Sequence, residues 1–243
     1  MKRRIKFWLN QKLSRWYSHQ LEHEALIPNN HWVAWNMLRC KGVDLQNIMD
    51  IGAAQGEWTR EILLYYKTAN YLLVDPLDEN KIFLEKLANE HGNVQYWMGV
   101  CGRENGRLDI NVHGDQTSIL SSKEWDVHVK RTVQMKKLDD LVQEKMSGVV
   151  DGLKIDVQGA ELEVLTGAIK TLSTCKIIQV EVSFRRVYEG MPLAHEIIVF
   201  FASHGFRIFD ITNFYKRKDH VPLQADLFFT SDDNLCIPES WYV

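Results

Sequence analysis

The sequence predicts an α/β fold with a mostly parallel, seven-stranded sheet. Seven apolar runs have the length of buried strands, and most are separated by segments in which apolar residues recur at helical spacing. The last two runs are joined by residues 213–221 without a helix, which predicts a C-terminal antiparallel hairpin. We expect strands at 47–51, 70–75, 94–100, 150–156, 175–182, 206–211 and 224–230, helices at 57–67, 79–90, 138–146, 160–172 and 193–204, and a hairpin-like insertion at 107–112 and 131–135.

The first 41 residues differ from the rest of the chain. The first 16 residues include basic side chains and no acidic one, interleaved with Phe7, Trp8 and Trp16. Such a segment either binds an anionic membrane surface reversibly or packs its aromatic side chains on its own domain. We expect an N-terminal helical cap or docking segment at 1–41, with peripheral membrane contact through residues 1–20 as one hypothesis, and a single domain at 42–243.

Composition excludes several classes of protein. With 243 residues and a formal charge of -3, the chain has no basic footprint for nucleic acid. Its four cysteines lie far apart without a disulfide or metal-binding pattern, as in proteins of a reducing compartment. No apolar run is long enough to span a bilayer, and no signal-peptide core follows the basic start. We expect a cytoplasmic protein, either free or peripheral at the inner face of the membrane.

The first expected strand runs into a turn of small residues. Asp50 and Gly52 lie at the strand end, and Gly56 directly precedes the helix. A dinucleotide site requires Gly-x-Gly-x-x-Gly, and Glu57 at the last position fits that pattern badly. The register Asp50-x-Gly52-x-Ala54-x-Gly56 instead resembles motif I of S-adenosylmethionine-dependent methyltransferases. The residues that this resemblance assigns to the donor site are Asp50, Gly52, Ala53, Ala54, Gly56, Glu57 and Trp58.

The next two strand ends extend the expected nucleotide site. Asp75 and Pro76 end the second strand, about 20 residues beyond the glycines, where a carboxylate accepts hydrogen bonds from ribose hydroxyls. A turn aspartate before proline is the alternative interpretation of Asp75. In methyltransferases the end of the third strand lies along the adenine, so the resemblance makes Val100 and Cys101 candidates for that wall.

The segment 149–168 contains Leu153-Lys154-Ile155-Asp156-Val157-Gln158-Gly159-Ala160-Glu161, followed by a helical pattern. It closely resembles the hallmark of the FkbM family of methyltransferases, with Gln158 in place of a frequent glutamate. The resemblance extends from about residue 47 to 229. It implies a Rossmann-like class I methyltransferase fold, S-adenosyl-L-methionine as donor, and O-methylation of sugars, polyketides or similar products. It also implies that Ser118, in a polar loop, lies near the donor.

Three carboxylates are candidates for catalysis. Asp156 and Glu181 end neighbouring expected strands, and Asp226 interrupts an apolar one. At the carboxyl edge of the sheet, Asp156 could bind the donor's ammonium group, hold a metal or act as a base, and these roles stay open. Two nearby carboxylates favour a general base or a divalent-cation site, so Mg²⁺ is possible in principle, but we predict no metal site. We expect Asp226 to face the site or to pair with Lys216 or Arg217.

The loop after the 175–182 strand is the expected acceptor-binding region. Arg185 and Tyr188 are placed in it to hydrogen-bond a polyol or an anionic sugar, although either residue could equally lie on the surface. Pairing with Arg185 is an alternative role for Glu181.

These patterns predict an S-adenosylmethionine-dependent O-methyltransferase. Its expected partner is a small-molecule or saccharide acceptor, in a polysaccharide or glycolipid pathway or among natural products. Two alternatives remain open. An NAD-dependent oxidoreductase would share Asp75 and the first βαβ unit. A catalytically silent S-adenosylmethionine-binding module would dock through residues 1–20. The sequence does not predict an oligomeric state.

Overall fold

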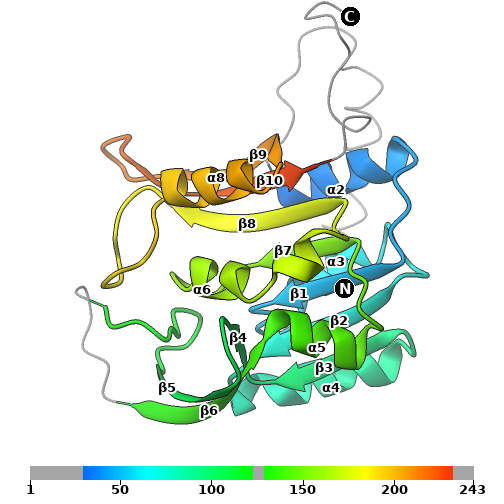
Figure 1. Cartoon of the computed structure of the whole chain (residues 1–243), viewed down its shortest axis with the longest axis horizontal. Helices are drawn as coiled ribbons and strands as arrows, with labels where there is room; N and C mark the ends of the chain where they lie inside the picture. Colours follow the sequence, from blue (N-terminus) through cyan, green and yellow to red (C-terminus); the bar gives the residue numbers. More distant parts are fainter. Residues whose placement is uncertain (1–29, 123–128, 232–243) are drawn as a thin grey trace, which may run out of the picture.

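The computed structural model describes residues 30–122 and 129–231. Within these ranges, the main sheet has seven strands in the order β3-β2-β1-β7-β8-β10-β9 (Figure 1). Its parallel strands are β1 (Asn47–Ile51), β2 (Asn70–Asp75), β3 (Val94–Met98), β7 (Gly152–Ile155) and β8 (Ile177–Ser183). β10 (Pro222–Thr230) runs antiparallel to both β8 and the edge strand β9 (Arg207–Lys216). The described residues therefore confirm the expected mostly parallel sheet and its C-terminal hairpin.

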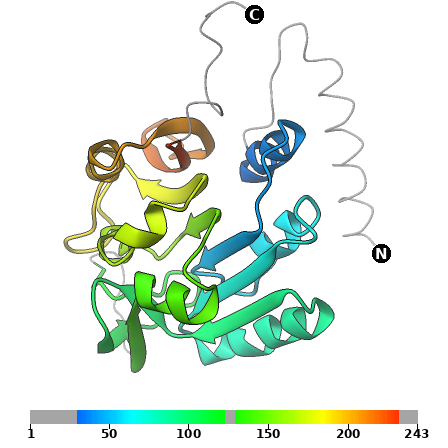
Figure 2. The ribbon, with the colours of Figure 1, turned by 45° about the vertical axis from the view of Figure 1, so that its right-hand side comes forward.

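Helices cover both faces of this sheet and make a three-layer structure (Figures 1 and 2). One face is covered by α2 (His31–Cys40), α3 (Glu57–Ile62) and α4 (Asp78–Glu90). The other is covered by α5 (Leu138–Lys145), α6 (Glu161–Thr166), α7 (Ile169–Leu172) and α8 (Ala194–Ser203). Because successive strand residues point to opposite faces, each central strand contributes apolar side chains to both layers. This is why the central strands are nearly continuous apolar runs.

The helix α2 belongs to the expected N-terminal cap. Its Trp35 is fully buried and packs edge-on against Trp58 of α3, with ring centroids 5.3 Å apart, and against Phe228 of β10, at 5.9 Å. These contacts attach α2 to the sheet through α3 and β10. Residues 1–20, for which membrane contact is one hypothesis, lie outside the described residues.

A second sheet accounts for two differences from the expected elements. The run expected as one strand at 94–100 divides into β3 and β4 (Val100–Gly102), and β4 pairs with β6 (Lys130–Lys137) instead of β2. β5 (Gly106–Asn111) completes the order β4-β6-β5, with β5 and β6 forming the expected hairpin. The division falls at Gly99, where a Cβ atom would lie 2.7 Å from the carbonyl oxygen of Gln134. The chain can pass from one sheet to the other here because glycine has no Cβ atom.

Two expected helices are also shorter than the apolar pattern indicates. The segment expected at 160–172 forms α6 and α7, separated at Gly167. A Cβ atom at Gly167 would lie 1.9 Å from the carbonyl oxygen of Gly102, so the backbones approach too closely for any other residue. The helix expected at 57–67 ends as α3 at Ile62, and the rest is turn. Among the described helices, none combines the length and apolar character needed to cross a membrane.

Candidate functional site

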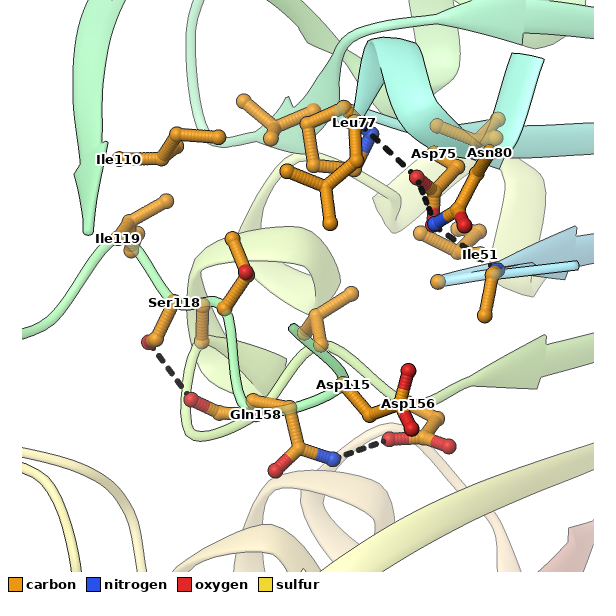
Figure 3. Close-up of a pocket in the computed structure, with 18 of the residues that line it drawn as sticks. Ile51, Asp75, Leu77, Asn80, Ile110, Asp115, Ser118, Ile119, Asp156 and Gln158 are labelled. Carbon is orange, nitrogen blue, oxygen red and sulfur yellow. Dashed lines mark hydrogen bonds between the residues drawn. The ribbon is translucent and has the colours of Figure 1, made fainter. Parts of the chain in front are cut away.

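The first cavity lies at the carboxyl ends of β1, β2 and β7, where parallel sheets commonly bind ligands. It has a volume of about 220 Å³. In Figure 3, Asp75 and Asn80 stand on one side, and Ser118, Gln158 and Asp156 lie across from them. Between these polar groups the cavity is lined by apolar side chains, including Ile51 of β1, Ile110 of β5, and Leu77 and Ile119 in the loops after β2 and β5. The cavity therefore suits an elongated ligand with polar ends and an apolar middle.

The turn after β1 is built for close approach to the backbone. Gly52 has a φ of 78°, and a Cβ atom there would lie 1.7 Å from the carbonyl oxygen of Asp156. No residue with a side chain fits at Gly52 without moving that strand end. Gly56 is left-handed (φ 75°) and caps α3. The backbone amides of Gly52 and Ala53 donate to the carbonyl of Val74, at 2.9 and 3.0 Å, so both are used within the fold.

Asp75 fixes this turn from the neighbouring strand. Its carboxylate accepts hydrogen bonds from the amide of Ala54 (2.9 Å), the amide of Leu77 (2.9 Å) and the side chain of Asn80 (2.9 Å). Burial raises the pKa of Asp75, and these hydrogen bonds oppose the rise. Asp75 lines the first cavity together with Pro76. It is thus both a structural carboxylate and a group that a ligand hydroxyl can reach.

Several other expected donor-site residues also line the first cavity. Val100 and Cys101 do so where β3 gives way to β4, Gly52 and Ala54 do so in the turn after β1, and Asp156 does so at the end of β7. Ser118 lines the opposite wall, where its hydroxyl donates to the carbonyl of Gln158 at 2.7 Å. The structure brings these residues together from elements far apart in the sequence.

Asp50 is placed differently from our expectation. It is fully buried on the face covered by α3, accepts a hydrogen bond from Thr59 (2.7 Å) and forms an ion pair with Lys154 (3.1 Å). Strand alternation is the reason, because Asp50 points to one face of the sheet while Ile51 points to the other. In the described structure, five of the expected donor residues do not line the first cavity: Asp50, Ala53, Gly56, Glu57 and Trp58.

Lys154 is a site residue that the sequence analysis missed. Its buried ammonium group contacts Asp50, the carbonyl oxygen of Gly52 (2.8 Å) and Asp156 (3.6 Å). Burial acts to lower the pKa of Lys154, but Asp50 and Asp156 outweigh it and raise the pKa. Lys154 therefore remains a cation that ties the turn after β1 to the end of β7. A lysine inside the apolar run 153–155 was the available signal.

The second cavity lies beyond Asp156 on the same sheet edge. Asp156, Glu181 and Asp226, the three expected catalytic carboxylates, all line it. Lys154, Trp58 of α3 and His31 of α2 contribute to its walls. Because Asp156 also lines the first cavity, this carboxylate stands where the two cavities meet.

Amide side chains hold the three carboxylates in place. Gln158 donates to both Asp156 (2.9 Å) and Glu181 (3.2 Å), and Gln224 donates to Glu181 (2.9 Å). Asp226 accepts from Gln179 (3.0 Å) and Asn213 (2.7 Å). The described structure therefore gives Glu181 amide partners in place of Arg185, and Asp226 amide partners in place of Lys216 or Arg217.

This crowding changes the proton affinity of the carboxylates. Burial, followed by repulsion from Asp156 and Asp226, raises the pKa of Glu181 well above its ordinary value. Burial also raises the pKa of Asp226, which His31 and the Asn213 hydrogen bond partly offset. A carboxylate with a raised pKa is suited to accept a proton near neutral pH. In the described part of the chain, no group of three or more His, Cys, Asp or Glu side chains is arranged to hold a metal ion.

A third cavity contains the two expected acceptor-binding residues. Arg185 and Tyr188 line it with Gln116, Gln158 and Glu181. Tyr188 is 4% exposed, and its hydroxyl donates to the carbonyl of Gln116 at 3.0 Å. Tyr188 thus serves the internal packing of the loop, whereas Arg185 is exposed at the rim.

Comparison with known proteins gives consistent results. A family model described as the methyltransferase FkbM domain matches residues 50–208. The 2-O-methyltransferase NoeI of Sinorhizobium fredii (strain NBRC 101917 / NGR234) is 27% identical over 169 residues, covering 60% of this chain and 67% of NoeI. The crystal structure of methyltransferase FkbM from Methylobacillus flagellatus KT superposes with a TM-score of 0.52 at 15% identity, covering 75% of this chain and 43% of that chain. This chain thus spans less than half of the solved chain, and the likeness confirms the expected Rossmann-like class I methyltransferase fold.

Proposed function

The chain belongs to the FkbM family of methyltransferases, and we propose that it transfers a methyl group from S-adenosyl-L-methionine to a hydroxyl oxygen of a saccharide or related natural product. The observation that carries this proposal is the junction at Asp156. There, a cavity with the position of a nucleotide site meets a second, carboxylate-lined cavity. A methyl donor on one side and a hydroxyl on the other would meet at this residue.

The first cavity fits the donor. Gly52 lines this cavity and lets the turn after β1 pack directly against the backbone of Asp156, and Asp75 presents a carboxylate to ribose hydroxyls. Val100 and Cys101 offer an apolar wall for adenine, and Asp156 offers a negative charge to an ammonium group. When bound, S-adenosylmethionine supplies the electrophilic methyl group. The residues of the chain contribute alignment, which can account for a large share of the rate.

Glu181 is the proposed general base. Its Oε2 atom accepts hydrogen bonds from both Gln158 and Gln224, which leaves Oε1 to take the proton of the acceptor hydroxyl. The raised pKa brings its proton affinity closer to what this transfer needs. The ion pair of Lys154 with Asp156 would keep these two charges in place beside Glu181 while Glu181 gains its proton.

The acceptor class rests on two supports. NoeI, to which the chain is similar, is named a 2-O-methyltransferase. The second and third cavities present carboxylate, amide, aromatic and guanidinium groups, which suit hydroxyl-rich ligands. We therefore place a sugar hydroxyl of a polysaccharide or glycolipid pathway first among acceptors, and other natural-product hydroxyls second.

Transfer of a labelled methyl group tests this proposal. The purified protein is incubated with methyl-labelled S-adenosylmethionine and a panel of sugar acceptors, and alkali-stable methyl ethers are counted. Glu181→Gln should lower the rate constant by about 100-fold or more, as expected for loss of a general base, while S-adenosylhomocysteine still binds. Glu90→Gln, an exposed residue at the end of α4, is the control and should leave the rate unchanged. Full activity of Glu181→Gln would remove Glu181 from the mechanism, and donor binding without transfer to any acceptor would favour a silent binding module.

A further inference from the structure

The second cavity has two carboxylates that are each anchored through one oxygen. Glu181 receives both of its amide hydrogen bonds on Oε2, and Asp226 receives both of its amide hydrogen bonds on Oδ2. Among the described residues, no hydrogen bond to Glu181 Oε1 or Asp226 Oδ1 is formed. The two residues are register partners on β8 and β10, and both line the cavity. Two fixed oxygen atoms are therefore available to a ligand in the same cavity.

These two carboxylates also have no cation of their own. Lys154 is engaged by Asp50, the Gly52 carbonyl and Asp156. The ring of His31 contacts Glu61 through Nε2 (3.1 Å) and the side chain of Asn213 through Nδ1 (2.8 Å). Within the described ranges, no Lys, Arg or His side chain forms an ion pair with Glu181 or Asp226. The cavity thus has an excess of negative charge, which a positively charged ligand group would neutralise.

Part of the wall of the second cavity comes from segments that the family model does not match. His31, Asn213, Tyr215 and Asp226 lie outside residues 50–208, whereas every described residue lining the first cavity lies inside that range. Asn213 has a left-handed φ of 49° in β9 and donates to Asp226 from this strained conformation. The first cavity thus lies wholly within the matched range, whereas the second combines matched residues with residues from α2, β9 and β10 outside it.

We propose that the second cavity binds the methyl acceptor and selects one that carries a protonated amine beside its hydroxyl groups, such as an amino sugar. This inference rests on the proposed function, because it requires a donor in the first cavity. The amine would lie at Asp226 Oδ1, close to the charge of Glu181, and the hydroxyl to be methylated would face Glu181 Oε1 on the side of Asp156. The aromatic rings of Trp58 and Tyr215 would flank the sugar ring. The same charge rejects acceptors with a carboxylate or phosphate.

The affinities of three sugars of similar size and different charge test the preference for a positively charged acceptor. The full chain is first saturated with S-adenosylhomocysteine, and glucosamine, glucose and glucuronate are then titrated at neutral pH by NMR. Glucosamine should bind about tenfold more tightly than glucose, the effect of one charge-assisted hydrogen bond, and glucuronate should bind most weakly. Equal affinities, tightest binding of glucuronate, or no saturable binding of any of the three would overturn the inference.

Variants assign the preference to this cavity. Asp226→Asn should reduce the preference for glucosamine to about twofold or less, because the amide carries no charge. Asp219→Asn, in the β9–β10 turn, where Asp219 pairs with Arg217, is the matched control and should keep the full preference. If Asp226→Asn does not fold, Glu181→Gln serves for the same comparison. A preference that survives in the folded variant contradicts the inference.

The donor step separates this inference from the proposed function. Failure of S-adenosylhomocysteine to saturate the protein contradicts the proposed function and the inference with it. Saturation without a preference for the amine contradicts the inference alone.

Discussion

Asp75 is the single residue on which donor binding should depend most. It joins the turn after β1 to the start of α4 and also lines the first cavity. Asp75→Ala should weaken S-adenosylhomocysteine binding by about 1–3 kcal/mol, the range for a buried charge-assisted hydrogen bond. Calorimetric titration measures the change. Asp78→Ala, an exposed substitution in the first turn of α4, is the control. Unchanged affinity in a folded Asp75→Ala protein would remove Asp75 from the donor site.

Glu161 should make stability depend on pH. Burial raises its pKa from 4.5 to about 7, although its carboxylate accepts a hydrogen bond from the amide of Gly159 at 3.0 Å. Between these two values the folded protein binds more protons than the unfolded chain. The stability that Glu161 contributes is therefore complete below pH 4.5 and is lost as the pH rises through about 7.

Glu161→Gln should remove this part of the pH dependence. An amide has the same shape and does not titrate, so the variant should lose less stability than the wild type between pH 5 and pH 8, by about 3 kcal/mol at most. Urea unfolding at the two pH values measures the difference. Identical pH dependence in the two proteins would show that Glu161 keeps an ordinary pKa.

Single residues also show where sequence analysis succeeds. Asp75 and Asp156 could be placed at the sheet edge because each ends an apolar run, and the end of a strand is visible in the pattern. Asp50, which we expected in the donor site, does not line the first cavity, because the pattern does not tell which face of the sheet a strand-end side chain occupies. Its partner Lys154 lies across from it in the register of β1 and β7, about 100 residues away in the chain.

At the scale of elements, the turn between β1 and α3 positions the strand end of β7. Gly52→Ala would place a Cβ atom 1.7 Å from the Asp156 carbonyl oxygen at a left-handed φ, so β7 or the turn must shift. We expect a loss of about 3 kcal/mol or more in the free energy of unfolding, together with weaker donor binding.

Gly92→Ala is the matched control for this element. It lies after α4, and a Cβ atom there would meet nothing within 4 Å. Chemical denaturation of both variants separates the crowding at Gly52 from the general effect of replacing glycine. Equal stability of the two variants would contradict the assigned role of the turn.

The elements themselves could be predicted in type and approximate position. Their hydrophobic periodicity is local, and buried strands of the central sheet are conspicuous. The separation of β4 from β3 and the division of α6 from α7 could not be predicted, because Gly99 and Gly167 act through contacts with Gln134 and Gly102. Such contacts depend on tertiary packing and leave no periodic signal.

At the scale of the whole molecule, the fold places two unlike cavities against one carboxylate. Asp156 lines both cavities. The first cavity lies at the ends of β1, β2 and β7, and the second is lined in part by residues of β8, β9 and β10. The antiparallel hairpin therefore adds a wall beside the parallel part of the sheet. The hairpin itself was predictable from the sequence, but its contact with His31 of α2 was not, because the two lie 182 residues apart.

The central claim is that the first cavity binds S-adenosylmethionine. Calorimetric titration of the purified protein with S-adenosylhomocysteine, with NADH as the comparison ligand, tests this claim most directly. We predict saturable binding of S-adenosylhomocysteine at one site and no binding of NADH. Binding of NADH alone would contradict the assignment of this cavity to a methyl donor.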